Sequence, residues 1–416
     1  MMHCGLDFGT SNSAVAVATS AGVELIPVEG DFRTLPSASF YRLEAGGSDG
    51  GLEIGRAAVS AYVDGDNGRF MRSMKSVLGT SLMDESTQIG ARQVRLRSVV
   101  AHYVVELKRR AEEACGHELR RVMQGRPVHF VDDDTQADAR AQSVLEDILT
   151  EAGFDEVAFE FEPVAAATHF ESMVERETLA LIADIGGGTS DFSVVRVSPG
   201  GTQSTDVLAN HGVRIGGTDF DRDLSLEAVM PLLGYGETLS GSRLEAPSWV
   251  YVDLATPSRI AMLHDRKSVL NINAITESSR RDPRFARLRD VIRDRSGHHI
   301  AGEVEQAKIT LTDAEHAVVN LDFVEAGLEA KADREMLRRS IHRPLERLAE
   351  AVDECLRRAG VTAAEVPLAV MTGGSTEMPM VRAAIAAQVP SARIENCDRF
   401  GAVAAGLARR AANTFR

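Results

Sequence analysis

The segment 179–191 constrains the fold of this chain more than any other stretch. Its first half is continuously apolar, which is typical of a buried strand. The strand ends in an aspartate and is followed by three glycines and a hydroxyl residue: Asp184, Gly186, Gly187, Gly188 and Thr189. Glycines in such a turn let several backbone N–H groups point at one anion. Asp184 would repel a bare phosphate, so a bridging cation such as Mg²⁺ is indicated. A nucleotide-phosphate loop and an ordinary glycine-rich turn both fit this segment alone.

The N-terminus repeats the pattern. Residues 2–8 predict a short strand that contains Asp7, and a turn follows with Gly9, Thr10, Ser11 and Asn12. Alternating Ala and Val at 14–18 predict a returning strand, so the whole is a hairpin. Two such hairpins predict two similar half-folds that hold one nucleotide between them. No Gly-Lys pair occurs in the chain, which excludes the Walker phosphate loop.

Composition narrows the class of protein. A chain of 416 residues is long enough for two large lobes with separate cores. Its net charge of −15 opposes binding to nucleic acid, whose phosphates would be repelled. No apolar run is long enough to cross a membrane, and the first residues do not resemble a signal peptide. The four scattered cysteines are interpreted as reduced thiols, and we expect a cytoplasmic protein.

Several segments between and beyond the hairpins carry candidate site residues. Residues 96–115 predict an amphipathic helix, and the aspartates at 132–134 are interpreted as capping the next helix or, less simply, as metal ligands. Glu162 ends a predicted strand at 157–161, where a catalytic carboxylate and a turn residue are equally good interpretations. Residues 211–221 form a third Gly-Gly turn, and an apolar strand at 366–371 ends in a fourth. Lys75 acquires no role from its spacing.

Six short motifs occur along the chain, at 7–10 (Asp-Phe-Gly-Thr), 75–79 (a Lys before Val-Leu-Gly), 162–167 (Glu-Pro-Val-Ala-Ala-Ala), 184–191, 215–221 and 373–376. Together they resemble the nucleotide-binding domain of the 70-kDa heat-shock (DnaK-type) chaperones, within the wider actin-like ATPase superfamily. The resemblance extends from residue 2 to about residue 408.

The resemblance implies an α/β actin-like ATPase fold of two lobes, each with a duplicated five-stranded sheet, flanking helices and an inserted subdomain. Lobe I would comprise residues 1–173 and 396–416, with an insert at about 34–100. Lobe II would comprise residues 174–395, with a mainly helical insert at about 218–338. Residues 408–416 resemble neither the linker nor the peptide-binding domain of the family, so we expect a short form without that domain.

The resemblance also implies roles for individual residues. Asp7 and Asp184 would hold Mg²⁺ through its waters, and Asp191 would help to place an ion or a water. Lys75 and Glu162 would orient the attacking water, with Asp184 and Thr189 completing the catalytic set. ATP or ADP would contact the residues of four turns and one helix: Gly9, Thr10, Ser11, Asn12, Gly186, Gly187, Gly188, Thr189, Gly216, Gly217, Glu305, Lys308, Gly373, Gly374 and Ser375.

The chain departs from the family pattern where the base would bind. Glu305 and Lys308 are present, but Ile309 replaces an arginine, Thr312 a serine, and Glu377 a second arginine. Two cation–π contacts of about 0.5–2 kcal/mol each would be lost, which corresponds to a five- to thousandfold weaker binding, roughly. The sequence therefore leaves the selection of adenine open.

The expected function is a slow Mg-dependent ATPase that acts as a chaperone-like nucleotide switch in protein folding or quality control. A protein partner or co-chaperone, which the sequence does not identify, would respond to the bound nucleotide. The alternatives are a non-hydrolysing or filament-forming actin-like scaffold and a small-molecule kinase on the same fold. Lys75 and Glu162 favour hydrolysis over a scaffold, and the 162–167 motif favours the chaperone group over a kinase.

Overall fold

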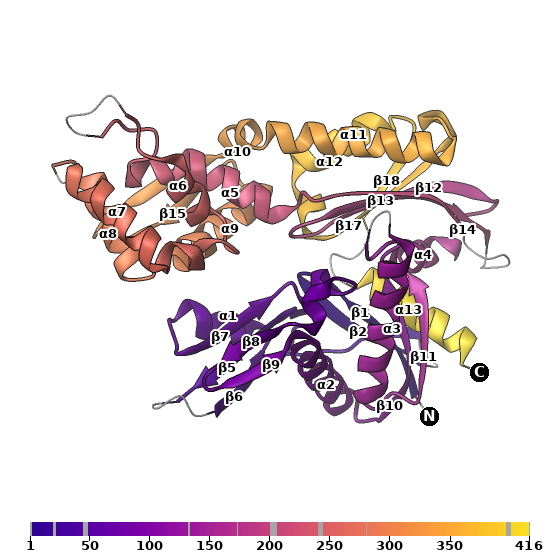
Figure 1. Cartoon of the computed structure of the whole chain (residues 1–416). Helices are drawn as coiled ribbons and strands as arrows, with labels where there is room; N and C mark the ends of the chain where they lie inside the picture. Colours follow the sequence, from indigo (N-terminus) through magenta and orange to yellow (C-terminus); the bar gives the residue numbers. More distant parts are fainter. Residues whose placement is uncertain are drawn as a thin grey trace.

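The computed structural model describes residues 2–19, 22–44, 49–131, 134–172, 174–199, 206–239, 244–279, 281–396 and 401–415. The chain folds into two lobes, each built on one twisted sheet (Figure 1). We call the part built on the N-terminal sheet lobe I and the part built on the second sheet lobe II. The two chain ends lie close together at one side of lobe I (Figure 1).

Both sheets have the same topology. The lobe I sheet has the order β3-β2-β1-β10-β11 and consists of β1 (Met2–Phe8), β2 (Asn12–Thr19), β3 (Gly22–Leu25), β10 (Leu119–Arg126) and β11 (Glu156–Phe161), with β4 (Leu35–Pro36) paired to β2 off this path. The lobe II sheet has the order β14-β13-β12-β17-β18 and consists of β12 (Thr178–Ile185), β13 (Ser190–Val197), β14 (Asp206–Val213), β17 (Leu368–Thr372) and β18 (Arg393–Asn396). In each sheet a central antiparallel hairpin has a third antiparallel strand on one side and two parallel strands on the other. This duplication confirms the predicted fold class.

Helices cover the outer face of each sheet. In lobe I, α2 (Leu96–Cys115) and α3 (Thr135–Glu151) pack on β1, β2 and β10 through one apolar core. The α3 helix starts as predicted, because Asp134 accepts hydrogen bonds from the backbone N–H groups of Gln136 and Ala137; Asp132 and Asp133 lie outside the described residues. In lobe II, α11 (His342–Ala359) and α12 (Pro379–Gln388) lie on the outer side of the sheet (Figure 1).

Two helices join the lobes. The short α4 (Glu162–Thr168) packs mainly on the lobe II sheet, and α13 (Ala402–Thr414) packs on β1, β2 and β10 of lobe I. They cross at very close range, since a Cβ placed on Gly406 would lie 1.9 Å from the carbonyl oxygen of Ala165. Small side chains at this crossing let α4 and α13 approach closely, which brings the ends of the two sheets together. Glu162 is the first residue of α4.

Each lobe carries an insert on the same side of the molecule (Figure 1). The lobe I insert contains a three-stranded sheet, one helix and a second hairpin: β5 (Ala38–Leu43), β6 (Asp49–Ile54), α1 (Arg56–Val63), β7 (Gly68–Arg72), β8 (Ser86–Ile89) and β9 (Arg92–Arg95). The lobe II insert contains the helices α5 (Gly217–Ala228), α6 (Ser248–Ala255), α7 (Arg266–Ser278), α8 (Pro283–Arg293), α9 (Gly297–Asp313) and α10 (Arg334–Ser340). It also contains a hairpin, β15 (His316–Asn320) with β16 (Glu329–Asp333), which the sequence analysis missed. The lobe boundaries stay a prediction.

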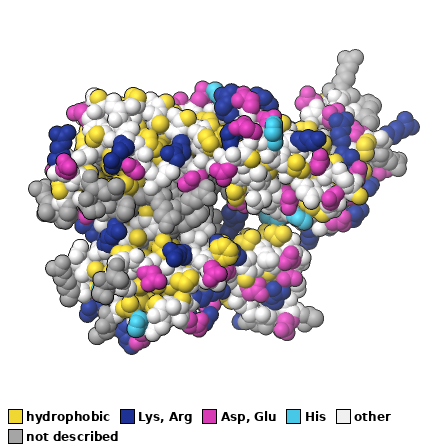
Figure 2. Space-filling model, turned by 180° about the vertical axis from the view of Figure 1, so that it is seen from behind, with side chains coloured by type: hydrophobic (Ala, Val, Ile, Leu, Met, Phe, Trp, Pro, Cys, Tyr) yellow, Lys and Arg dark blue, Asp and Glu magenta, His cyan; other side chains and the backbone are white. Residues whose placement is uncertain are grey.

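Seen from behind, the surface mixes acidic and basic side chains over both lobes (Figure 2). Among the described residues, most arginines pair with a nearby carboxylate; Arg109 with Glu106 and Arg357 with Glu354 are examples within helices. Opposite charges therefore lie next to one another over much of the surface, although the net charge of the chain is negative. No helix of the described part is long and apolar enough to cross a membrane.

Candidate functional site

The two phosphate hairpins meet between the lobes. The first turn, residues 9–11, joins β1 to β2, and the second, residues 186–189, joins β12 to β13. A Cβ placed on Gly187 would lie 2.5 Å from the Ser11 hydroxyl oxygen, so the two turns are in contact range. Asp184 pairs with Asp191 across the second hairpin, which puts both side chains on one face of the sheet. The structure therefore brings both predicted phosphate loops to one place.

Lys75 and Glu162 form a close ion pair beside these turns. The Lys75 ammonium nitrogen donates a hydrogen bond to Glu162 Oε1 at 2.5 Å, and only 9% of the lysine side chain is exposed. Burial lowers the pKa of Lys75, but the charges of Glu162 and Asp7 outweigh it and hold the pKa above its ordinary value. These residues are 87 positions apart, so no local spacing in the sequence could have indicated the pair.

Lys75 is aimed into the site by an unusual backbone turn. It lies in a short 3₁₀ segment, Met74–Val77, directly after β7. Ser73 before it has a φ of 57°, in the left-handed region that few residues other than glycine adopt. Such strain persists where the surrounding structure enforces it, and it is common at functional sites.

The charges of Lys75 and Glu162 also act on two further carboxylates, Asp7 and Asp184. Burial and the charge of Glu162 raise the pKa of Asp7 to about 8, although Lys75 counteracts them. Burial and Glu162 likewise raise the pKa of Asp184 to about 6. Three carboxylates thus share one ammonium group, which leaves a local excess of negative charge and favours a bound cation.

The arrangement fits a hydrated cation better than one bound directly by several side chains. Among the described residues, no group of three or more His, Cys, Asp or Glu side chains is placed to hold a metal ion. Mg²⁺ commonly keeps several of its waters and uses one or two carboxylates together with substrate phosphates. Asp7 and Asp184 are the residues that would hold it in this way.

A small cavity adjoins this centre. Its volume is about 20 Å³, and its polar lining comes from α4 and from strands of lobe II: Glu162, Asp184, Asp191, Ser193, Asn210 and Thr372. Its apolar wall is built by Pro127, Val128, Pro163, Ala166, Ile182 and Val403. A cavity of this size holds about one water molecule.

Buried hydroxyl groups support the first phosphate loop. The Ser37 hydroxyl donates to the Gly9 carbonyl oxygen at 2.7 Å, and the Ser37 backbone N–H donates to the carbonyl of Ser11 at 2.8 Å. The Ser37 and Ser13 hydroxyl oxygens are 2.9 Å apart, and both side chains are at most 2% exposed. Tyr103 of α2 is fully buried beneath them and donates to the Pro36 carbonyl at 3.2 Å.

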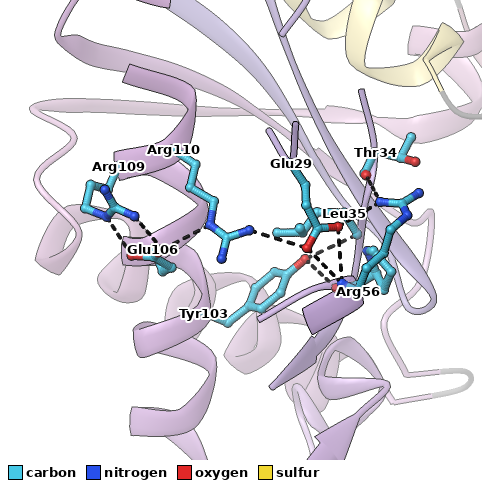
Figure 3. Close-up of polar contacts among 9 residues, drawn as sticks. Glu29, Thr34, Leu35, Arg56, Tyr103, Glu106, Arg109 and Arg110 are labelled. Carbon is cyan, nitrogen blue, oxygen red and sulfur yellow. Dashed lines mark hydrogen bonds and ion pairs between the residues drawn. The ribbon is translucent and has the colours of Figure 1, made fainter. Parts of the chain in front are cut away.

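The segment that carries Ser37 is anchored at its other end by Glu29 (Figure 3). Glu29 accepts hydrogen bonds at 2.9 Å from both the backbone N–H and the guanidinium of Arg56, the first residue of α1. Its other partner is Arg110 of α2, at 3.6 Å. The Arg56 guanidinium also donates to the Thr34 carbonyl at 2.7 Å. Segment 29–37 therefore connects the lobe I insert to the first phosphate loop.

The second phosphate loop is supported mainly by backbone. The N–H groups of Gly217 and Thr218 donate to the carbonyls of Gly186 and Gly187 at 2.9 and 2.7 Å. A Cβ placed on Gly216 would lie 2.5 Å from the backbone nitrogen of Gly188. The Ser375 hydroxyl donates to the Gly186 carbonyl at 3.1 Å, which attaches the fourth Gly-Gly turn to the same loop.

The fourth turn follows β17 directly. Gly373 has a φ of 85°, and a Cβ there would lie 2.4 Å from the Ile185 carbonyl oxygen. Only glycine permits this approach of Gly373 to the end of β12. Gly374 is exposed at the turn, and Ser375 is buried.

The predicted nucleoside residues on α9 are divided between interior and surface. Lys308 is 8% exposed and forms an ion pair with the buried Asp221 of α5, with oxygen atoms at 2.8 and 2.9 Å. Its third contact is the Gly217 carbonyl at 3.3 Å. Glu305 and Ile309 are exposed, the latter by 46%. Lys308 thus joins α9 to α5 in this structure.

Several supporting residues were missed in the sequence. Ser37, Tyr103 and Asp221 are buried polar groups whose partners lie far along the chain. The Thr218 hydroxyl donates to the Gly187 carbonyl at 2.5 Å. Asp221 belongs to the motif at 215–221 and could have been identified from it. Ser37 and Tyr103 lie outside every motif, so nothing in the sequence pointed to them.

Comparison with known proteins identifies the family of this chain. A protein family described as "Hsp70 protein" matches residues 3–230 and 286–413. The chain is 29% identical over 425 residues to the chaperone protein HscA homolog of Shewanella sp. strain ANA-3, covering 97% of the chain and 57% of the relative. It is 26% identical over 411 residues to the chaperone protein DnaK of Halobacterium salinarum, covering 97% of the chain and 54% of that protein.

The chaperone protein DnaK of Endomicrobium trichonymphae is 25% identical over 386 residues, covering 91% of the chain and 52% of the relative. The chain thus spans a little over half the length of each of these curated relatives. The family match covers both lobes, the duplicated sheets and the two phosphate hairpins. On this evidence the chain belongs to the Hsp70 family.

Proposed function

We propose that this chain is a slow Mg-dependent ATP hydrolase that acts as a nucleotide switch of the chaperone type. The observation that carries the proposal is the Lys75–Glu162 ion pair, held at 2.5 Å between two phosphate hairpins from different lobes. A pair with both side chains at most 15% exposed is costly to desolvate, so a purely structural scaffold gains little from it.

Each part of the site has a role in phosphoryl transfer. The turns at 9–11 and 186–189 would bind the phosphates through backbone N–H groups, with Thr10 and Thr189 adding hydroxyl donors. Asp7 and Asp184 would hold hydrated Mg²⁺, which neutralises developing charge on the phosphates when bound. Glu162 would accept a hydrogen bond from the attacking water, and Lys75 would hold Glu162 and that water in place. Positioning and charge neutralisation suffice for this reaction.

The small cavity favours hydrolysis over transfer to a metabolite. A kinase needs room for its acceptor next to the transferred phosphate, together with a carboxylate base. Asp191 could serve as such a base, but the space it lines with Glu162 is about 20 Å³. That volume accommodates a water molecule, which is the acceptor that hydrolysis needs.

The switch itself would be the angle between the lobes. Nucleotide contacts both hairpins, so bound and free states differ in the free energy of lobe closure. A protein partner or co-chaperone that prefers one angle would then respond to the nucleotide. The relatives are named chaperones, which supports a role in protein folding or quality control.

The test separates binding from hydrolysis. We expect Lys75→Ala and Glu162→Ala to lower the rate of phosphate release at least a hundredfold, roughly the effect of removing a positioned catalytic group, while ATP affinity changes less than tenfold. Lys331→Ala removes an equally charged side chain that is 82% exposed, and it should behave as the wild type. Equal loss of binding and turnover in both site variants would contradict the assigned roles.

A further inference from the structure

The inserts of the two lobes touch one another through an aromatic contact to which the proposed hydrolysis gives no role. Tyr62 of α1 and His298 of α9 are 236 positions apart in the sequence, and the tyrosine hydroxyl is hydrogen-bonded to Nε2 of the histidine. Their rings also meet edge to face, with centroids 4.2 Å apart. Both inserts lie away from the joint that α4 and α13 form between the lobes (Figure 1). The contact therefore joins the lobes at a second place.

Tyr62 is held in position by its own lobe. Its ring stacks on Phe70 of β7, with centroids 4.2 Å apart and planes 6° apart, and both side chains are half-buried. Burial raises the pKa of Tyr62 to about 12, although the charges of Arg72 and Arg69 act in the opposite direction. The hydroxyl thus keeps its proton at neutral pH, and His298 meets a fixed hydrogen-bond donor.

The charged groups that act on His298 are positive. One is Arg72, the last residue of β7 in lobe I, and the other is His264, the last residue of the 3₁₀ segment Ile260–His264 in lobe II. Burial in the contact, Arg72 and His264 lower the pKa of His298 from 6.5 to about 4. An imidazolium at this position would be poorly hydrated and repelled by its neighbours.

The next residue of α9, His299, has different surroundings. Its ring stacks on Phe323 of the same lobe, with centroids 3.7 Å apart, and its Nε2 lies 4.0 Å from a carboxylate oxygen of Glu303. Its side chain is 45% exposed. Adjacent positions of a helix point in directions about 100° apart. His299 therefore packs within lobe II, whereas His298 contacts lobe I.

We propose that the Tyr62–His298 contact is a latch operated by a proton: protonation of His298 separates the two inserts and speeds the release of nucleotide. A neutral imidazole can accept the hydrogen bond from Tyr62 at Nε2, whereas an imidazolium donates at both nitrogens and cannot accept it. Separation of the inserts returns the imidazolium to water and moves it away from Arg72. The effect on nucleotide rests on the proposed function, and it adds a regulation of that same site.

The direction of the pH effect follows from the linkage between protonation and opening. In the open state His298 has its ordinary pKa of 6.5, so the open state binds the proton more tightly than the closed state. The contact is fully stabilising above about pH 6.5 and loses stability as the pH falls towards 4. Between pH 7 and pH 5.5 the ratio of open to closed molecules should rise about eightfold. Because nucleotide leaves from the open state, its release rate should rise by the same factor.

The experiment measures the release of a fluorescent ADP analogue from the full chain, with Mg²⁺, at pH 7 and pH 5.5. Burial raises the pKa of Asp184 to about 6, and this carboxylate titrates in the same range, so each variant is compared with the wild type at both pH values. His298→Gln keeps a hydrogen-bonding side chain that does not titrate. Release should accelerate about eightfold more in the wild type than in His298→Gln.

Two further variants separate the latch from other effects. His299→Gln is the matched control, since it removes the neighbouring histidine, and it should accelerate as the wild type does. Tyr62→Phe removes only the hydroxyl contact with His298. It should release the analogue about two- to twelvefold faster than the wild type at pH 7. Equal acceleration in the wild type and His298→Gln, or an equal loss of acceleration in His299→Gln, would overturn the latch.

A second measurement needs no nucleotide. Small-angle X-ray scattering of the nucleotide-free chain should give a larger radius of gyration at pH 5.5 than at pH 7 for the wild type and His299→Gln, with a smaller change for His298→Gln. The same change in all three proteins would contradict the latch. A wild type that binds no ADP analogue would overturn the proposed function, and the scattering would still decide whether His298 controls the contact between the inserts.

Discussion

The first phosphate loop is supported mainly by buried hydroxyl groups, whereas the second is held mainly by contacts of backbone with backbone, to which the hydroxyls of Thr218 and Ser375 add hydrogen bonds. Ser37 and Ser13 lie beneath the first loop, and their hydroxyl oxygens are 2.9 Å apart. At the second loop, a Cβ on Gly216 would fall 2.5 Å from the nitrogen of Gly188. The two hairpins thus have the same strand order and their turns lie in contact range, but different interactions hold each turn in place.

The difference shows which changes each copy tolerates. A hydrogen bond to the first loop can be removed at a modest cost, because the surrounding strands remain in place. A side chain added at the second loop must displace main chain, which the packed lobe II core resists. We therefore expect variants of the second loop to have the larger effect on nucleotide binding.

The largest effect is expected for Gly216→Ala. Overpacking of this kind typically costs about 1–3 kcal/mol of folding free energy. Because the added methyl group displaces the loop and the phosphates bind the loop in its native position, binding would bear the same cost, which corresponds to about a five- to 150-fold loss of ATP affinity. Calorimetric titration with Mg-ATP measures it. Ser60→Ala, at an exposed serine of α1, is the control. If Gly216→Ala bound ATP as well as the wild type, the second loop would not be packed as described.

The second prediction concerns pH and the carboxylates shared by both loops. Burial and the charge of Glu162 raise the pKa of Asp7 to about 8. Mg-nucleotide binding favours the ionised form, so affinity should rise by about eightfold between pH 7 and pH 8.5, as one proton is released. The terminal phosphate has its own pKa of about 6 and changes little in this range.

The stability of the nucleotide-free protein should change in the opposite direction. Between about pH 4 and pH 8 the folded state keeps a proton on Asp7 that the unfolded chain has released. The free energy of unfolding is therefore highest at the acid end of this window and falls as pH rises through it. Thermal unfolding at pH 5, 6.5 and 8 measures the trend, and Asp7→Asn should remove most of the fall between pH 6.5 and pH 8, since Asp184, with a pKa of about 6, contributes mainly below that range. A wild-type midpoint that rises toward pH 8 would contradict the raised pKa.

A smaller effect is expected when the support of the first loop is removed. Ser37→Ala deletes the hydrogen bond to the Gly9 carbonyl, at a cost of about 0.5–1.5 kcal/mol. The affinity for ATP and ADP should fall about two- to twelvefold. Ser60→Ala, an exposed serine of α1, serves as the control. A loss as large as that of Gly216→Ala would remove the distinction between the two loops.

The smallest effect is expected at Glu29. Glu29→Gln keeps an acceptor for the Arg56 backbone N–H but weakens the charge contacts with Arg56 and Arg110. Partly exposed ion pairs contribute about 0.2–1 kcal/mol, so the unfolding midpoint should fall by at most about 4 °C, and less in high salt. ATP affinity should change less than twofold. A larger drop in affinity would mean that the segment 29–37 transmits more than local stability.

Much of the fold could be predicted because it depends on local patterns. The turn chemistry at 9–12 and 186–189 identified both hairpins, and apolar periodicity identified the helix at 96–115 with the bounds that α2 has. Hairpin β15–β16 was missed because its alternation is short: only Ala317 and Val319 of β15 are buried. An alternating pattern with only two buried residues is hard to distinguish from part of a helix.

Residues of the candidate site could be predicted only where they belong to a recognisable sequence motif. Spacing gave no role to Lys75, because its partner Glu162 is 87 residues away. For Lys308 the resemblance implied a nucleotide contact, and the structure adds a buried ion pair with Asp221 that helical spacing could not reveal. The roles of these residues toward nucleotide stay predictions.

Calorimetric binding of ATP, ADP and GTP with and without Mg²⁺, combined with phosphate release, tests the central claim most directly. We predict Mg-dependent binding of ATP and ADP, followed by slow release of phosphate that Glu162→Ala abolishes. No detectable binding of any of the three nucleotides would contradict the account, and the two hairpins would then be structural elements of a scaffold.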